Sequence, residues 1–492
     1  MRWQRNVVRL ALLALALPGQ GARADYMDHF VVRDDVGPHK APSLGKAELL
    51  VIPVEVKGFR PFDRAALERF FSADDPKGFV QYYETASLHR YHPHVTVAQT
   101  VVFDTCPLPE AQFPGCAVQR ADLGALLPGL EMIREVMRRA RALGGFTFGQ
   151  LDVNGVAGKS DGWADGVMIL TNSPFGGIAL PFGFYNTGDN LNGGTGGPMI
   201  LDGTRVGHVA IGGSGNAHVL VHEFGHLLGL TDLYAESDTY RGLDLSVMGS
   251  WPYDDRIPLP DAETRYRLRW GNWHQVAGTR TVVVQPAETS GEVWRLGTGQ
   301  EYWLVENRGP GVFDGLVTSR GLALFHVDRT VKLAGEEGRF QDRSLNPVND
   351  DPWRSYIMWV QADGAFHVQH DSPPDWEFDL FRDGDSWGPS DDTAPFSGTH
   401  AVFSSNTYAG AKTGLGLHDV KVRPDGAIEV TFEAPADGQC DERLCDQGDG
   451  CAPVSCQAPA TTPPRSGCGT VLLPPLAVAA LVWARRRRVS AS

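Results

Sequence analysis

The chain has 492 residues, a net charge of −15 and 42% hydrophobic residues. This length suits two or three globular units with buried cores. The acidic balance and the lack of an internal Lys/Arg-rich stripe exclude nucleic acid as a partner, because phosphate binding needs clustered positive charge.

The first 24 residues have the three parts of a secretory signal peptide. Three arginines among the first nine residues precede the apolar run Leu10–Leu17, and an Ala-Arg-Ala site follows at residues 22–24. This order is typical of signal peptides that are removed on export, although a buried N-terminal helix is the alternative. We therefore expect a secreted protein whose mature chain starts with a short segment, residues 25–45.

The next part of the chain alternates between strand and helix patterns. Apolar periodicity predicts helices over Arg60–Ser72, with Asp63 placed to cap it, and over Leu126–Leu143. Strand patterns occupy Lys46–Val56, Tyr91–Phe103, Asp165–Thr171 and Arg205–Ile211. This order predicts an α/β sheet with helices packed against it.

A motif that carries chemistry lies on the predicted helix Asn216–Leu228. His222 and His226 are four residues apart, so a helix places them on the same face, where they can bind one metal ion. Glu223 stands beside the first histidine and is the expected general base for a metal-bound water. The alternative, two hydrogen-bonded histidines on a half-buried helix, leaves the residues that follow unexplained.

Gly229 and Asp232 complete the predicted metal site. Gly229 ends the helix, because glycine readily adopts the left-handed conformation that turns the chain. The turn lets Asp232 return as a third ligand and leaves a fourth position for water. Three protein ligands plus water are typical of catalytic zinc sites, so the expected cofactor is Zn²⁺.

From about residue 281 the chain changes to short strand patterns separated by long polar loops. These patterns occupy Thr281–Val284, Tyr302–Val305, Leu322–Val327, Ile357–Val360 and Ile428–Phe432. They predict a β-rich domain over residues 281–433 that follows a mixed catalytic domain over residues 46–280. The predicted fold class is therefore α+β.

The cysteines agree with export to an oxidising compartment. Cys106 and Cys116 enclose a proline-containing loop and are expected to pair. Four more, Cys440, Cys445, Cys451 and Cys456, lie in a Pro- and Ala-rich linker over residues 434–466. We expect two local disulfides there; zinc binding is the alternative, but a C-x₂-C spacing is missing.

The C-terminal residues 467–492 combine a Gly-Cys-Gly motif, an apolar run and four consecutive arginines. This arrangement resembles the bacterial tripartite sorting signals that carry a Gly-Cys motif. The resemblance implies processing near Cys468 and attachment to the cell surface. A plain membrane anchor with a basic flank is the alternative.

Further residues give the chain a family resemblance. Met248 stands sixteen residues past Asp232 within Leu-Ser-Val-Met-Gly, which is similar to the methionine-containing turn of metzincin-type proteases. With the pattern H-E-x-x-H-x-x-G-x-x-D, the chain resembles the immune inhibitor A group of M6 peptidases. Segments 301–308, 313–316 and 321–328 fit the β-rich second half of that family. The resemblance covers residues 46–433.

This resemblance implies a metzincin-like catalytic domain in which His222, His226 and Asp232 bind zinc and Glu223 is catalytic. Met248 would support the site from below. Tyr253, five residues further on, is a candidate donor to the oxyanion, although a core aromatic is the common alternative.

Members of that family often have an acidic calcium loop, which would fall near residues 152–155. Here the acidic residues spread from Asp152 to Asp161 and Asp165. Calcium sites need several oxygens that converge in one loop, so Ca²⁺ binding is left open.

Together these patterns predict a secreted or surface-attached zinc metalloendopeptidase that hydrolyses extracellular proteins and peptides through a metal-activated water. We expect a monomer. Two alternatives remain: a catalytically silent surface adhesin on the same fold, and a zinc amidohydrolase for a non-peptide substrate. The presence of Glu223 counts against the adhesin, because loss of that carboxylate is the simplest way to abolish turnover.

Overall fold

The computed structural model describes residues 41–104, 130–153, 160–172, 177–181, 199–213, 215–234, 243–249, 257–331, 349, 351–370, 372–397, 400 and 403–435. All of them belong to one compact unit that extends to Cys451. The signal segment, the tail, all seven cysteines and the linker after residue 435 lie outside the described residues, so those calls stay predictions. No helix in the described ranges is long and apolar enough to cross a membrane.

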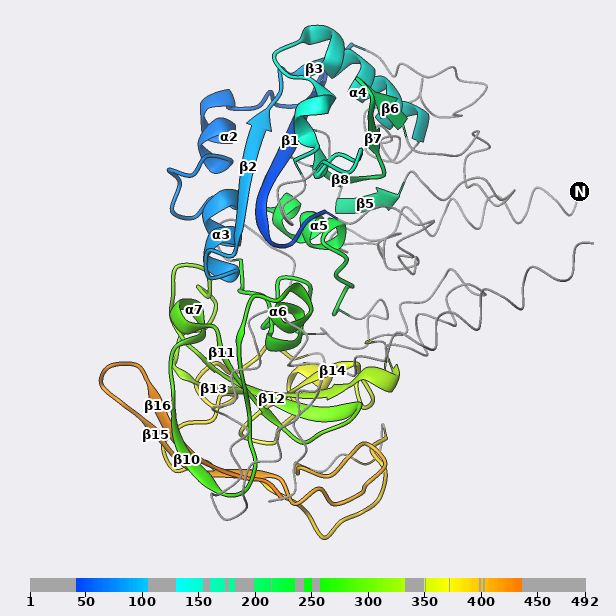
Figure 1. Cartoon of the computed structure of the whole chain (residues 1–492). Coiled ribbons are helices and arrows are strands. Elements are labelled where there is room, and N and C mark those ends of the chain that lie inside the picture. Colours follow the sequence, from blue (N-terminus) through cyan, green and yellow to red (C-terminus); the bar gives the residue numbers. More distant parts are fainter. Residues whose placement is uncertain are drawn as a thin grey trace, which may run out of the picture. The chain divides into compact units, whose positions relative to one another are not determined.

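In the described part of the chain, six strands form one mixed sheet (Figure 1). The strands are β1 (Gly45–Val56), β2 (Tyr91–Val97), β3 (Val101–Phe103), β4 (Gly166–Thr171), β5 (Gly177–Pro181) and β8 (His208–Gly212). β1 pairs in parallel with β2, β3 and β4, and β4 pairs in parallel with β8. β5 pairs antiparallel with β8 at the edge, which makes the sheet mixed.

Helices cover both faces of this sheet, because side chains along a strand point alternately to opposite sides. Leu49 and Val51 of β1 pack in one core with side chains of α2 (Arg64–Phe70), α3 (Phe79–Ala86) and α5 (Val219–Leu227). Leu50 and Ile52 pack in another core with α4 (Leu130–Leu143). The predicted arrangement of helices packed against a sheet is therefore confirmed.

Local boundaries differ from the sequence patterns in several places. α2 starts at Arg64 rather than Arg60, and Asp63 caps it as predicted, since its Oδ1 accepts a hydrogen bond from Ala66 N at 3.1 Å. The single strand expected at Tyr91–Phe103 is divided into β2 and β3. The strand expected at Arg205–Ile211 is likewise divided, because β7 (Thr204–Val206) pairs with β6 (Met199–Leu201), while β8 joins the large sheet.

The predicted β-rich region is present in the second half of the chain, where the described residues form two further sheets. One has the order β14-β13-β12-β11-β9, and the other has the order β10-β16-β15. The five strands expected there are present as β10 (Arg280–Val284), β12 (Glu301–Arg308), β13 (Gly321–Asp328), β14 (Ile357–Val360) and β16 (Ile428–Glu433). Elements that the patterns did not indicate are β9 (Asn272–Gln275), β11 (Glu292–Leu296), β15 (Gly416–Val422), α6 (Ala262–Leu268) and α7 (Ala287–Ser290).

The five-stranded sheet connects the two halves through its two faces. Leu304 and Phe325 belong to the same core as Phe224 of α5. Trp303 and Val305 point the other way, into the core shared with the three-stranded sheet. The domain boundary expected near residue 280 stays a prediction, but the hydrophobic core around α5 is built from both halves.

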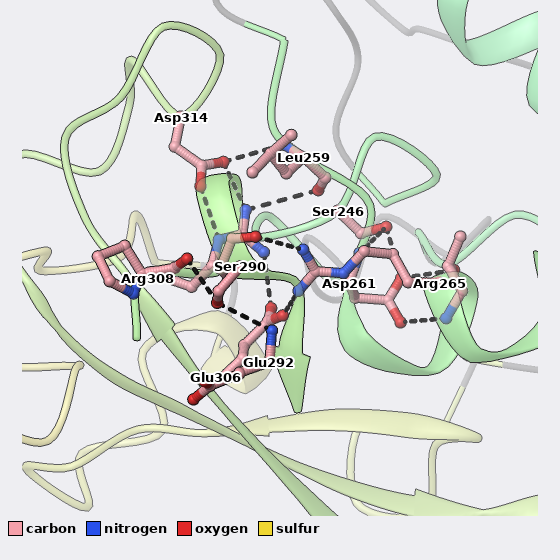
Figure 2. Close-up of polar contacts among 12 residues, drawn as sticks. Ser246, Leu259, Asp261, Arg265, Ser290, Glu292, Glu306, Arg308 and Asp314 are labelled. Carbon is pink, nitrogen blue, oxygen red and sulfur yellow. Dashed lines mark hydrogen bonds and ion pairs between the residues drawn. The ribbon is translucent and has the colours of Figure 1, made fainter. Parts of the chain in front are cut away.

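A buried network of charges also joins these parts (Figure 2). Arg308 of β12 donates from Nε and Nη2 to the two oxygens of Asp314, at 2.7 and 2.5 Å, and from Nη1 to Glu306 Oε1 at 2.8 Å. Arg265 of α6 forms an ion pair with Glu306. Burial lowers the pKa of Arg265 to about 10, so its guanidinium remains charged at neutral pH.

Breaking this network at one partner should strongly destabilise the fold. Asp314→Asn keeps the side-chain volume but leaves the buried guanidinium groups of Arg308 and Arg265 with one carboxylate, that of Glu306, between them. Removing one partner of a buried ion pair costs about 3–5 kcal/mol. Urea unfolding followed by tryptophan fluorescence measures this loss. The matched control is Asp391→Asn, which breaks the exposed pair with Lys412 and should leave the midpoint unchanged. Equal effects of the two substitutions would contradict a structural role for the buried pair.

Candidate metal centre

The three residues predicted as metal ligands converge in the structure, and all three are buried. Nε2 of His222 and Nε2 of His226 lie 3.3 Å apart. They lie 3.0 and 3.2 Å from Oδ1 of Asp232. Two donors that each lie about 2.0–2.1 Å from a tetrahedral zinc ion are about 3.3 Å apart, so the three atoms have the spacing of zinc ligands.

The orientation of both imidazole rings is set by backbone carbonyls. Nδ1 of His222 lies 2.7 Å from the carbonyl oxygen of Val247, and Nδ1 of His226 lies 3.1 Å from that of Leu230. A carbonyl oxygen only accepts, so each Nδ1 carries the proton and each Nε2 presents a lone pair when the ring is neutral. The two Nε2 atoms and Asp232 Oδ1 then face one another as three acceptors, which repel one another. A cation bound between them would remove this repulsion.

The electrostatics of Asp232 agree with metal binding. Burial alone raises the pKa of this carboxyl, but without a metal ion the positive charges of protonated His226 and His222 and the hydrogen bonds that they donate outweigh burial and hold its pKa well below the usual range. A bound metal would take the place of these protons on the Nε2 atoms. The carboxyl is therefore ionised, which is the form that binds a metal.

The chain reversal after α5 has the predicted cause. α5 ends at Leu227, and Gly229 has a left-handed backbone with φ +86°. Leu230 N donates to Gly225 O at 3.1 Å, which closes the turn that carries the chain to Asp232. Arg267 of α6 donates from Nη2 to Gly229 O at 3.1 Å and holds the turn from outside.

Met248 packs directly against α5. A Cβ atom at Gly225, which lies between the two histidines in the chain, would come within 2.6 Å of Met248 Sδ, so a larger residue there requires the buried Met248 side chain to shift. The backbone of the same turn makes two more contacts: Val247 O accepts from His222, and Met248 O accepts from Leu233 N at 2.8 Å. The turn therefore contacts the chain on both sides of the site, and the family role expected for Met248 stays a prediction.

The other predicted site residues have different outcomes. Glu223 is buried in α5 next to His222, and its role as a base stays a prediction. Tyr253 lies outside the described residues. An aromatic residue that the sequence patterns did not indicate, Tyr234, stacks on His222 with ring centroids 6.1 Å apart.

The acidic residues considered for calcium shape the local backbone. Asp152 accepts hydrogen bonds from Asp161 N and Gly162 N, both at 2.8 Å, and from Ser160 Oγ. Asp165 accepts one from Glu48 N at 3.0 Å. Residues 154–159 lie outside the described part, so calcium binding at this loop stays open.

A second group with metal-ligand spacing among the described residues consists of Asp363, His367 and Asp379. Asp379 already accepts hydrogen bonds from Gln361 Nε2 at 2.5 Å and Asp375 N at 2.7 Å, and lies 3.2 Å from His367 Nδ1. These contacts account for the buried carboxylate without an ion. His367 of this group is therefore a suitable control position for metal binding at the first site.

The chain matches no protein-family model and no curated protein. The support for a metal site is therefore the geometry and chemistry of His222, His226 and Asp232 themselves.

The contact between Gly225 and Met248 can be tested by a double-mutant cycle in metal-free protein. Met248→Ala should cost about 2–5 kcal/mol, because it leaves a cavity in the core. Gly225→Ala should be tolerated better in the Met248→Ala background than in wild type, because the new methyl group then meets no sulfur. Urea unfolding should show a coupling of about 0.5 kcal/mol or more. Additive effects would contradict the close packing.

Proposed function

We propose that the protein is a zinc-dependent metalloendopeptidase with a metzincin-like catalytic domain. The observation that carries the proposal is the convergence of His222 Nε2, His226 Nε2 and Asp232 Oδ1 at distances of 3.0–3.3 Å. Two imidazoles and one carboxylate are a donor set that suits zinc. The HExxH order adds Glu223, the residue that this class of hydrolase uses as a base.

The fold supports the same proposal. α5 carries both histidines and packs against the large sheet, with Met248 in the same core. A buried methionine turn beneath a zinc helix is the arrangement that the resemblance to metzincins implies. The mixed α and β composition with a β-rich second half also fits the expected fold class.

The roles of the residues follow from their positions. Zinc, when bound there, would polarise the scissile carbonyl and lower the pKa of a water molecule. Glu223 would take a proton from the attacking water and give it to the leaving amine. His222 and His226 would bind the metal through Nε2, because backbone carbonyls accept hydrogen bonds from their Nδ1 atoms. Tyr253 stays the proposed donor to the oxyanion.

The proposal extends to where the protein acts. An N-terminal signal peptide and the tail at residues 467–492 would place a monomeric enzyme outside the cell or on its surface. Its substrates there are extracellular proteins and peptides.

Glu223→Gln tests the catalytic role. The substitution preserves the shape of the side chain but removes its ability to take a proton, so casein cleavage should fall by about 10²–10⁴-fold. Zinc content by elemental analysis should stay at the wild-type level. Glu68→Gln, on the exposed face of α2, is the matched control and should keep full activity. An active Glu223→Gln protein would refute the assigned base, while zinc-loaded but inactive wild type would favour a silent binding protein.

Asp232→Asn tests the third ligand. An amide is a much weaker zinc ligand than a carboxylate, so zinc occupancy after dialysis against a weak chelator should drop by about 10-fold or more. His367→Gln removes the histidine of the second group and should leave occupancy unchanged. The opposite pattern would assign the bound metal to Asp363, His367 and Asp379.

A further inference from the structure

The turn that orients His222 is itself held by a buried side chain that the metal site does not use. Ser246 lies directly before Val247 and Met248 and is completely buried. Its hydroxyl donates to Asp261 Oδ2 at 2.7 Å, and its oxygen lies 3.3 Å from Met248 N, which donates to it. The side chain therefore ties the methionine turn to a residue fifteen positions further along the chain.

Asp261 is fixed from the other side by α6. Its Oδ1 caps that helix by accepting from Thr264 N at 2.9 Å, and its Oδ2 accepts from Thr264 Oγ1 at 2.6 Å. Figure 2 shows Ser246 and Asp261 beside Arg265, whose ion pair with Glu306 ties α6 to the five-stranded sheet. The carboxylate of Asp261 is therefore a fixed anchor point.

Asp314 adds a second connection close to this anchor. Its Oδ1 accepts from Leu259 N at 2.9 Å while both of its oxygens bind Arg308. Leu259 lies two residues before Asp261, so the strand position of Arg308 also restrains the start of α6. A continuous series of buried contacts thus runs from β12 through Asp261 and Ser246 to the carbonyl that accepts from His222.

We propose that Ser246 and Asp261 are positioning residues for the metal centre. They hold the Val247 carbonyl where it keeps the Nε2 atom of His222 directed toward Asp232. This inference rests on the proposed function, because a role in metal binding requires that His222 is a metal ligand. Partners that orient a ligand in this way typically change metal affinity by about 10–100-fold when they are removed.

Ser246 could instead serve only the stability of the fold. Thr264 provides the comparison that separates this role from a positioning role. Its buried hydroxyl donates to the same oxygen of Asp261 as the Ser246 hydroxyl does, at a similar distance. Among the described residues, Thr264 forms its side-chain hydrogen bond with Asp261 and none with residues 245–249 of the methionine turn. Loss of the Thr264 hydroxyl removes the bond to Asp261 Oδ2 alone. Loss of the Ser246 hydroxyl removes the bond to the same oxygen and also those accepted from Asp261 N and Met248 N, so only the loss at Ser246 releases the turn.

The test compares Ser246→Ala with Thr264→Val in the full chain. Zinc affinity is measured by competition with a chromophoric chelator, the ligand geometry by the visible absorption of Co²⁺-loaded protein, and stability by urea unfolding without metal. Both substitutions should destabilise the metal-free protein, Ser246→Ala by more, because its hydroxyl makes more hydrogen bonds. Ser246→Ala alone should lower zinc affinity by about 10-fold or more and shift the Co²⁺ bands. Ser246→Thr, which keeps the hydroxyl, should restore the affinity.

The outcomes separate this inference from the proposed function. Equal zinc affinities for Ser246→Ala, Thr264→Val and wild type would overturn the positioning role and leave the metal site standing. Wild type that binds no zinc would overturn both. If Ser246→Ala does not accumulate as folded protein, Ser246→Cys replaces it, because the thiol fills the place of the hydroxyl but is only a weak donor and acceptor. It should lower zinc affinity in the same way, and unchanged affinity would again overturn the role.

Discussion

The candidate site depends on two hydrogen bonds that lie behind the metal-facing atoms. Each histidine directs Nδ1 to a backbone carbonyl, Val247 O for His222 and Leu230 O for His226. Without these acceptors the rings could rotate or change tautomer, and the Nε2 atoms would not face Asp232 together. The surrounding fold serves to hold two carbonyl groups in place, one from the turn after α5 and one from the methionine turn.

These two carbonyls are supported by different parts of the chain. Leu230 O is local, because the left-handed Gly229 sets it within one turn of α5. Val247 O is remote, because its turn is tied through Asp261 to α6 and through the ion pairs of α6 to β12. The β-rich half therefore contributes to the site by packing and by buried charge, without supplying a metal ligand from the described residues.

The sequence could predict the parts that depend on local periodicity. Helical spacing places His222 and His226 together, glycine at position 229 predicts the reversal, and apolar patterns identify strands such as β1 and β13. It could not predict α3, the division between β7 and β8, or the bond from Ser246 to Asp261. Those features depend on which segments meet in space, and a serine in a short motif has no pattern that indicates its partner.

The packing of Met248 has a consequence for resistance to oxidants. Its sulfur lies completely buried against Gly225, so peroxide reaches it only when the core opens. A sulfoxide oxygen, once formed, would add a polar atom to the sulfur that already packs closely against Gly225, between the two histidines. Met248 is thus protected from oxidants. Its oxidation would disturb the positions of His222 and His226 rather than the protein surface.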